Sequence, residues 1–285
     1  MKIQTAKAYY QLMRFDKPIG WLLLMWPTLS ALWLAASATG PSLFRISVFV
    51  LGVWTMRAAG CVINDMADAQ FDKAVARTAQ RPLASGALTR RQAASCLLFL
   101  LVLALILLLQ LPKICWGLAI IGLLLTFLYP FTKRFFKAPQ LILGIVFNWG
   151  IIVAVAAELN TVPGWAWIFY LSQLGIVVAY DTIYALMDKE DDLSLPIHSL
   201  AITLGHYLYP VLLSCYVLAT LGFLLVGLIL KLSWPFYLGL GVHTSLLLWQ
   251  WYRLAILKRK TYFQAFAKHH WAGLILFISI VCCLF

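Results

Sequence analysis

The sequence is poor in charged residues, and acidic residues are the scarcest of all. Asp and Glu number 10 in a chain of 285 residues, whereas Lys and Arg number 22. Charged residues make up 11% of the chain, against about 25% in soluble domains. The mean hydropathy is +0.90. This composition excludes an ordinary soluble globular domain.

Three other patterns are also absent. The apolar stretches, such as residues 97–111, show no alternation of apolar and polar residues, which excludes a membrane β-barrel. The first apolar stretch, 19–37, is too long for the core of a cleaved signal peptide and lacks a small-residue cleavage pattern. The six cysteines are scattered without metal-ligand spacing, so we expect them to pack as small hydrophobic residues.

Apolar stretches long enough to cross a membrane recur along the whole chain. About 20 apolar residues in a helix span roughly 30 Å of hydrocarbon. We therefore predict an all-α polytopic membrane protein, with residues 1–285 forming a single domain. The predicted spans are nine in number and cover residues 18–37, 43–63, 92–111, 114–131, 139–157, 164–184, 208–230, 235–254 and 268–285.

The basic residues gather on one side of these spans. Most lie in the N-terminal tail and in the connections that follow the second, fourth, sixth and eighth spans. The other side holds only Arg45, Lys113 and Lys231. By the positive-inside rule, the N-terminus is cytoplasmic and the C-terminus lies outside. The net charge of +12 therefore reflects membrane orientation rather than binding to nucleic acid.

Eight of the ten carboxylates fall in two short segments, 64–72 and 181–192. Each segment follows an even-numbered span, four spans apart, on the predicted cytoplasmic side. This coarse repeat predicts two related helical segments that face each other across one cavity. On a helix, the three aspartates of the first segment lie within about 60° of one another, and Asp181, Tyr184, Asp188 and Asp192 share a face about 80° wide.

Carboxylates packed this closely repel one another unless a cation neutralises them. Hard oxygen ligands are typical of Mg²⁺, which binds one or two carboxylates together with waters and substrate phosphates. The alternative is that acidic loops simply solvate a cytoplasmic face. The predicted Mg²⁺ ligands are Asn64, Asp65, Asp68, Asp72, Asp188 and Asp192.

Basic residues lie next to the acidic ones. Arg77 and Arg81 are four residues apart, so on a helix they would present paired guanidinium groups, which bind phosphate in bidentate fashion. Lys133 and Arg134, at the cytoplasmic end of the fourth span, would add to this clamp. We predict a diphosphate held between these side chains and Mg²⁺. The alternative is that all four only follow the positive-inside rule.

Arg57 differs from the other basic residues because it lies inside a predicted span. A charge within the membrane is costly and marks a functional site by default. It precedes Asn64 by two helical turns, so it lies about 10 Å deeper on the same face. This spacing suits a small aromatic acid between Arg57 and the metal. A structural pair with a buried partner is the alternative.

At these residues the chain resembles the UbiA-type membrane prenyltransferases. The pattern Asn-Asp-x-x-Asp-x-x-x-Asp occurs at 64–72, Arg-Thr-x-x-Arg-Pro-Leu-Ala-Ser-Gly at 77–86, and Asp-Thr-x-Tyr-Ala-x-x-Asp-x-x-Asp-Asp at 181–192. Segments 16–20, 26–28, 57–61 and 129–134 resemble the hydroxybenzoate branch of the family. The chain departs from the family pattern after the second acidic segment, where Pro196 and His198 replace a usual Gly and Lys and Thr203 a common Arg.

The resemblance implies nine helices around a cavity that opens laterally to lipid, in a bacterial inner membrane with the active site facing the cytoplasm. It implies Mg²⁺-dependent transfer of a polyprenyl group from polyprenyl diphosphate to the carbon ortho to the hydroxyl of 4-hydroxybenzoate, a step of ubiquinone biosynthesis. Within this reaction we expect Asp181 to contact substrate, Asp191 to accept the ring proton, and Tyr129 and Tyr184 to shield the allylic cation, although aromatic residues in such spans also serve as core.

Two alternatives remain open. Within the same family the acceptor could instead be a naphthoate, a porphyrin (as in haem synthesis) or a lipid glycerol phosphate. A cation-coupled transporter also carries carboxylates and internal repeats, but its acids would lie in the middle of the spans. Here the acidic segments follow the spans, beside basic residues typical of a phosphate site, which favours the enzyme. The sequence indicates no particular protein partner.

Overall fold

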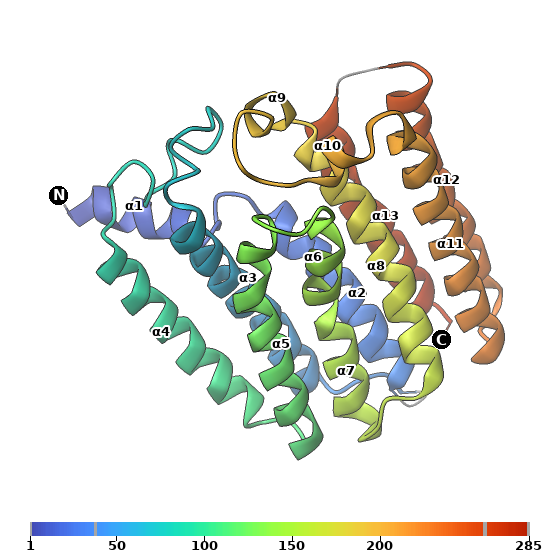
Figure 1. Cartoon of the computed structure of the whole chain (residues 1–285). Coiled ribbons are helices and arrows are strands. Elements are labelled where there is room, and N and C mark those ends of the chain that lie inside the picture. Colours follow the sequence, from blue (N-terminus) through green and yellow to red (C-terminus); the bar gives the residue numbers. More distant parts are fainter. Residues whose placement is uncertain (1, 37–38, 259–260, 284–285) are drawn as a thin grey trace.

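The computed structural model describes residues 2–36, 39–258 and 261–283, and in these ranges every regular element is a helix (Figure 1). The all-helical class is therefore confirmed. The helices are α1 (Lys2–Leu12), α2 (Ile19–Ala35), α3 (Leu43–Asp68), α4 (Arg90–Leu108), α5 (Lys113–Thr132), α6 (Pro139–Phe147), α7 (Trp149–Leu159), α8 (Gly164–Ala185), α9 (Lys189–Asp192), α10 (Leu200–Thr203), α11 (Leu208–Ile229), α12 (Trp234–Ala255) and α13 (Tyr262–Val281), with a 3₁₀ turn at Gly205–Tyr207.

Each predicted span corresponds to one helix or to a pair of consecutive helices. Among the described residues, six segments are long and apolar enough to cross a membrane, namely α3, α4, α5, α6 with α7, α8, and α11 with its preceding turn. Helix α2 is shorter, at 17 residues. Helices α12 and α13 carry buried polar side chains, including His243, Gln250 and His269, which lower their hydropathy. A polytopic membrane protein is thus supported, and the count of nine spans stays a prediction.

The fifth predicted span is broken at Asn148. This residue has φ −93° and ψ 0°, and its side-chain amide donates to the Gly144 carbonyl at 2.9 Å. In a continuous helix, Phe147 and Trp149 would point in nearly opposite directions, because two residues turn the helix by about 200°. With the break, both side chains line the same cavity. The sequence analysis missed this break.

Helices α8 and α11 pack closely against each other. Gly222 on α11 shows how closely α8 approaches, since a Cβ there would lie 2.0 Å from Ser172 Oγ. Small residues at helix contacts are typical of membrane bundles. Helices α4 and α5 lie at the other edge (Figure 1) and expose most of their apolar side chains. These two helices are the least buried of the six span-length segments, so this edge offers a broad apolar surface to lipid.

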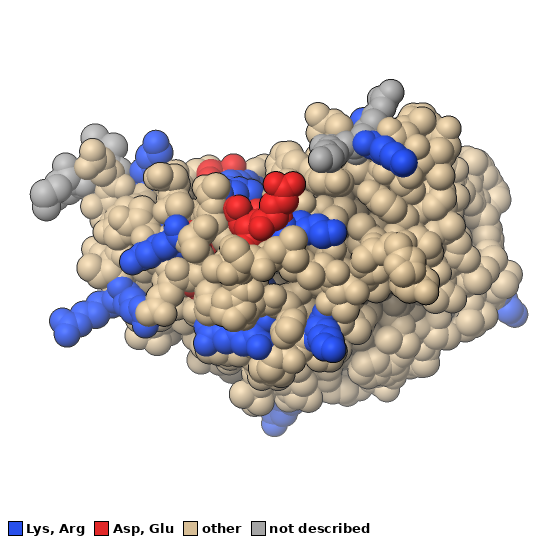
Figure 2. Space-filling model, turned by 45° about the horizontal axis from the view of Figure 1, so that its top comes forward, with Lys and Arg blue, Asp and Glu red and all other residues tan. Residues whose placement is uncertain are grey.

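Helices α3 and α8 end at the same end of the bundle, as the sequence predicts for the two acidic segments (Figure 1). The segment 69–89, between α3 and α4, and the segment 186–207, after α8, cover this end. Figure 2 shows acidic side chains near the centre of this face, with Lys and Arg side chains around them. The functional residues predicted from the sequence meet beneath these two segments.

Candidate functional site

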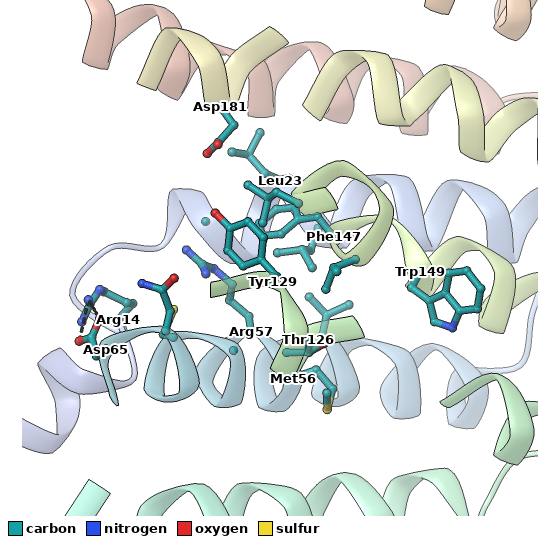
Figure 3. A pocket seen from close by; sticks show the side chains of 18 of the residues that line it. Arg14, Leu23, Met56, Arg57, Asp65, Thr126, Tyr129, Phe147, Trp149 and Asp181 are labelled. Atoms are coloured by element: carbon teal, nitrogen blue, oxygen red, sulfur yellow. Dashed lines mark hydrogen bonds and ion pairs between the residues drawn. The ribbon is translucent and has the colours of Figure 1, made fainter. Parts of the chain in front are cut away.

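A cavity of about 1150 Å³ lies between α2, α3, α5 and α8 and reaches α4. Its end nearest the two covering segments is polar, and the rest is apolar. In Figure 3, Arg14, Asp65, Arg57, Tyr129 and Asp181 lie at the polar end, and Met56, Thr126 and Trp149 lie farther along. The predicted site residues that line this cavity are Arg57, Asn64, Asp65, Asp68, Asp72, Arg77, Arg81, Tyr129, Lys133, Asp181, Tyr184, Asp188 and Asp192. The structure therefore brings together all but two of the predicted residues.

The first acidic segment leaves the helix earlier than expected. Helix α3 ends at Asp68, and Asp72 lies in the turns beyond it. The Asp72 amide still donates to the Asp68 carbonyl at 2.9 Å, so the chain makes one more helix-like turn. The hydroxyl of Thr78 donates to the Asp72 carbonyl at 3.0 Å and holds the following turns in place. Asp65, Asp68 and Asp72 thus all face the cavity.

Two arginines neutralise Asp65 and Asp72. Arg14 Nη2 donates to both carboxylate oxygens of Asp65, at 2.6 and 2.8 Å, and the Asp65 side chain is 1% exposed. Arg81 Nη1 donates to both oxygens of Asp72 at 2.9 Å and lies 3.3 Å from Asp65. Burial raises the pKa of Asp72, and the charge of Arg81 opposes this shift. The carboxylates remain buried because each has a cation beside it.

Arg14 is a basic residue of the N-terminal tail and was not among the residues predicted for the site. Arg14 follows α1 and has a φ of 59°, in the left-handed region that non-glycine residues rarely adopt. Its guanidinium also donates to the Gln11 carbonyl at 2.8 Å. No local sequence pattern predicts that Arg14 pairs with Asp65, because the two residues are 51 positions apart in the sequence.

The second acidic segment is not one helix. Helix α8 ends at Ala185, and the short helix α9 begins after Asp188. The predicted continuous helical face from Asp181 to Asp192 is therefore wrong. Asp181, Asp188 and Asp192 nevertheless line the same cavity, since the break turns the chain back over the end of the bundle.

Arg77 and Arg81 do not form the predicted pair. The segment 69–89 consists of turns, with no helix at 77–81. Arg77 donates to both carboxylate oxygens of Asp188 and, at 2.6 Å, to the Tyr184 hydroxyl, and its Cζ lies 4.8 Å from the centroid of the Tyr184 ring. The two arginines therefore bind opposite acidic segments. Arg77 pairs with Asp188 and Arg81 with Asp72, and these ion pairs hold the two guanidinium groups apart. The spacing of four residues would place them on one face only if the segment were a helix.

Two predicted residues do not line the cavity. The Asp191 carboxylate accepts a hydrogen bond from the Ala76 amide at 3.2 Å and so joins the two covering segments. Arg134 donates to the Ala67 carbonyl at 2.9 Å and lies over the rings of Phe71 and Phe131. These contacts place Asp191 away from the position expected of a ring-proton acceptor, and Arg134 away from the predicted clamp.

Among the predicted site aspartates that line the cavity, Asp181 and Asp192 form no ion pair within the described ranges. Burial, reinforced by the negative charge of Asp188, raises the pKa of Asp192 to about 6. Both carboxylates are therefore available to a ligand without first breaking an ion pair.

The deeper basic residues also face the cavity. Lys133 Nζ binds Asp68 at 3.1 Å and lies 5.5 Å from the centroid of the Tyr129 ring. Arg57 Cζ lies 5.4 Å from the centroid of the Phe147 ring. Arg57 Nε is buried, and within the described ranges it has no hydrogen-bond partner. The alternative of a structural ion pair for Arg57 is therefore not found in this part of the chain.

The loop that departs from the family pattern is tied down by its backbone. The His198 amide donates to the Lys133 carbonyl at 2.7 Å, and the Thr203 hydroxyl donates to the Lys137 carbonyl at 3.0 Å. His198 also lines the cavity. The departures therefore leave the loop docked on the connection between α5 and α6.

The oxygen ligands in the cavity suit an Mg²⁺ ion that is bound together with an anionic ligand. They do not suit a metal ion that is held by protein side chains alone. In the described ranges, no three His, Cys, Asp or Glu side chains converge closely enough to hold a metal alone. Magnesium needs only one or two carboxylates and takes its other ligands from water and phosphate. Aspartate oxygens with the Asn64 amide beside them supply the hard donors that this ion prefers.

Arg81→Ala should destabilise the protein in the absence of added Mg²⁺, because it leaves Asp72 buried without a cation. We expect a loss of about 3 kcal/mol in the free energy of unfolding, as is typical when one partner of a buried pair is removed. Arg90, which is exposed, serves as the control, and Arg90→Ala should change stability by less than about 0.5 kcal/mol. Thermal unfolding in detergent measures both. Equal midpoints would contradict the assigned role of Arg81.

Comparisons with known proteins identify the family of the chain. The model of the UbiA prenyltransferase family matches residues 24–280. The chain is similar to a 4-hydroxybenzoate octaprenyltransferase of Alcanivorax borkumensis, with 48% identity over 276 residues that cover 97% of this chain and 95% of the relative.

Two solved structures share the fold. An apo structure of a UbiA homolog from Aeropyrum pernix K1 has a TM-score of 0.81 and 22% identity, covering 92% of this chain and 97% of that one. A UbiA homolog from Archaeoglobus fulgidus bound to GPP and Mg²⁺ has a TM-score of 0.73 and 14% identity, covering 97% and 99%. Because the family model covers most of the sequence and a relative of this identity covers nearly all of it, the chain belongs to the UbiA prenyltransferase family.

Proposed function

We propose that this protein transfers a polyprenyl group from polyprenyl diphosphate to the carbon ortho to the hydroxyl of 4-hydroxybenzoate, a step of ubiquinone biosynthesis. The observation that carries the proposal is one cavity with a charged end and a long apolar arm. Such a shape suits a diphosphate with a hydrocarbon tail. The close relative named for this activity, which matches over nearly its whole length, supports the acceptor.

The cations at the charged end would bind the diphosphate. Arg77, Arg81 and Lys133 each pair with a carboxylate and line the cavity. A diphosphate offers several anionic oxygens, to which guanidinium groups bind in bidentate fashion. When held by Asn64, Asp65, Asp68, Asp72, Asp188 and Asp192, Mg²⁺ would neutralise the charge that develops on the leaving diphosphate. The Mg²⁺-bound homologue supports this assignment.

The apolar arm would hold the isoprenoid tail. It runs between α3, α4 and α5, and its walls include Leu101, Leu105, Leu108, Ile120 and Leu123. Helices α4 and α5 bury little of their surface in the bundle, so lipid lies close to this arm. A substrate with a long hydrocarbon tail could reach the arm from the membrane without passing through water.

The acceptor would lie between the diphosphate and the deeper residues. Its carboxylate would bind Arg57, whose buried Nε has no partner within the described ranges. The ring of Tyr129 lies beside this space (Figure 3), and its π face, with that of Tyr184, would stabilise an allylic cation. Asp181 faces the same cavity and is free of ion pairs in the described chain, so we assign it, rather than Asp191, to accept the ring proton.

An acceptor panel tests this proposal directly. Isolated membranes with a polyprenyl diphosphate and Mg²⁺ should prenylate 4-hydroxybenzoate far faster than a naphthoate, a porphyrin or a lipid glycerol phosphate. The relative named for hydroxybenzoate gives the reason for this preference, since Arg57 alone would also pair with the carboxylate of a naphthoate. Product analysis by mass spectrometry gives the measurement. Preference for another acceptor would replace hydroxybenzoate in the proposal, and no transfer to any acceptor would reject the enzyme.

Asp68→Asn should lower this activity by at least about a hundredfold, because it removes an oxygen anion from the predicted metal site and leaves Lys133 unpaired. Glu190 lies in the second acidic segment but is exposed and does not line the cavity, so Glu190→Gln is the matched control. The control should keep near-normal activity. Initial rates over a Mg²⁺ titration check both variants. Similar rates for the two would argue against the metal assignment.

We also propose nine spans, with the end that carries α9 in the cytoplasm. The Lys and Arg side chains around the acidic centre in Figure 2 support this orientation. With an odd number of spans, the two termini lie on opposite sides of the membrane. Alkaline phosphatase fused to the carboxyl terminus should then be active, and a green fluorescent protein fused there should stay dark. The reverse pattern would overturn the span count or the orientation.

A further inference from the structure

Arg45 and Glu158 form an ion pair at the far end of the bundle, opposite the acidic segments. Arg45 Nε lies 3.4 Å from a carboxylate oxygen of Glu158, and the two side chains are 24% and 19% exposed. Arg45 lies in the first turn of α3 and Glu158 in the last turn of α7, both at the lower end of Figure 1. Arg45 Nη1 and Glu158 Oε1 are buried and form no hydrogen bond within the described ranges. The proposed function uses neither residue.

Each of these charges lies at the end of its helix that disfavours it. The N-terminus of a helix carries a partial positive charge and the C-terminus a partial negative charge. A cation in the first turn of α3 and an anion in the last turn of α7 therefore each oppose their own helix dipole. A charge without a partner in an apolar bundle is also costly. Because the contact between the two side chains offsets these costs, its effect is to join α3 to α7.

The cavity stops one to two helical turns before this ion pair. On α3 the residue nearest the far end that lines the cavity is Val48, and on α7 it is Val153. Arg45 and Glu158 lie about 5 and 8 Å farther along these helices, at a rise of about 1.5 Å per residue. At the other end, beneath the covering segments, water reaches the cavity, because its lining includes three exposed polar residues, Asp16, Lys17 and His198.

A thin layer of buried side chains separates the cavity from the far end. Phe49 and Leu111 line the cavity and are 7% and 9% exposed. Cys115, in the first turn of α5, is fully buried, and its thiol donates to the Val153 carbonyl at 3.7 Å. Arg45 is close enough for its charge to act on this thiol. The ion pair therefore lies next to the layer and ties two of the helices that surround it.

We propose that the Arg45–Glu158 pair closes the far end of the cavity and keeps water and ions from crossing the protein. Water reaches the cavity at the acidic end, so only the buried layer and this pair separate it from the opposite side of the membrane. The positive charge of Arg45 adds an electrostatic barrier to protons and other cations. This closure goes beyond the proposed function, because it does not depend on which acceptor the enzyme uses.

Modification of Cys115 by a water-soluble maleimide measures the closure. With the purified full-length protein in detergent, mass spectrometry of peptides gives the rate at Cys115 separately from the other cysteines. Glu158→Ala leaves Arg45 without an anion, and an unpaired buried charge attracts water. The rate at Cys115 should therefore rise at least about tenfold, since a buried thiol reacts only when the layer around it opens.

Two further variants serve as controls. Lys113→Ala removes an exposed cation two residues from Cys115 and leaves the ion pair intact, so Cys115 should react at the wild-type rate. The double variant Arg45→Met, Glu158→Leu replaces the pair by apolar side chains. Such a replacement of a buried ion pair is often neutral for stability, so the layer should stay closed and Cys115 should again react as in the wild type.

Proteoliposomes test the barrier itself. The full-length protein is reconstituted in vesicles that contain a pH-sensitive dye, and the rate of proton entry is measured after a step in external pH, below the unfolding temperature of each variant. Glu158→Ala should admit protons several times faster than the wild type, whereas both control variants should match the wild type. If Glu158→Ala lowers the midpoint of thermal unfolding but admits protons no faster, the pair is only a structural contact, and the proposal fails even where Cys115 reacts faster.

Discussion

The structure depends on neutralising carboxylates that are buried at one end of an apolar bundle. An isolated buried carboxylate is highly unfavourable, so each needs a cation or a proton. Arg14, Arg81, Lys133 and Arg77 supply the cations, and they come from three separate parts of the chain. Segment 69–89 follows from this requirement. Its turns carry Arg81 to one acidic segment and Arg77 to the other, which closes the end of the cavity.

The same ion pairs explain how the site could receive its ligands. A basic side chain that pairs with aspartate is already positioned for phosphate, and the aspartate it leaves is positioned for a divalent cation. Under the proposed function, binding of an Mg²⁺–diphosphate pair would exchange partners within the cavity and leave no charge exposed to hydrocarbon. Asp181 and Asp192 stand outside this exchange, because neither has a cationic partner in the described chain. They remain available for a proton or a metal ligand.

The sequence predicts those features that depend on composition and local spacing. The hydropathy of the sequence predicts where the helices lie. The Lys and Arg residues in the connections predict that both acidic segments lie at the same end of the bundle. The sequence does not predict where helices end, since α3 ends at Asp68 and Asp72, which was expected on the same helical face, lies in the turns beyond it. The break at Asn148 was not predicted either, although this asparagine is a polar residue inside an otherwise apolar run, because a single polar residue does not by itself end a helix. Arg14 could not be assigned either, because its partner lies 51 residues away.

The ion pair at the far end shows most clearly why spacing alone is insufficient. From the sequence, Arg45 is one of three basic residues on its side of the spans, and Glu158 is an acidic residue outside both acidic segments. No local pattern relates them, because one lies at the start of α3 and the other at the end of α7. The structure places them 3.4 Å apart, and this contact accounts for two charges at helix ends that disfavour them. Neutralisation of charge thus shapes both ends of the cavity, through aspartate–cation pairs at one end and the Arg45–Glu158 pair at the other.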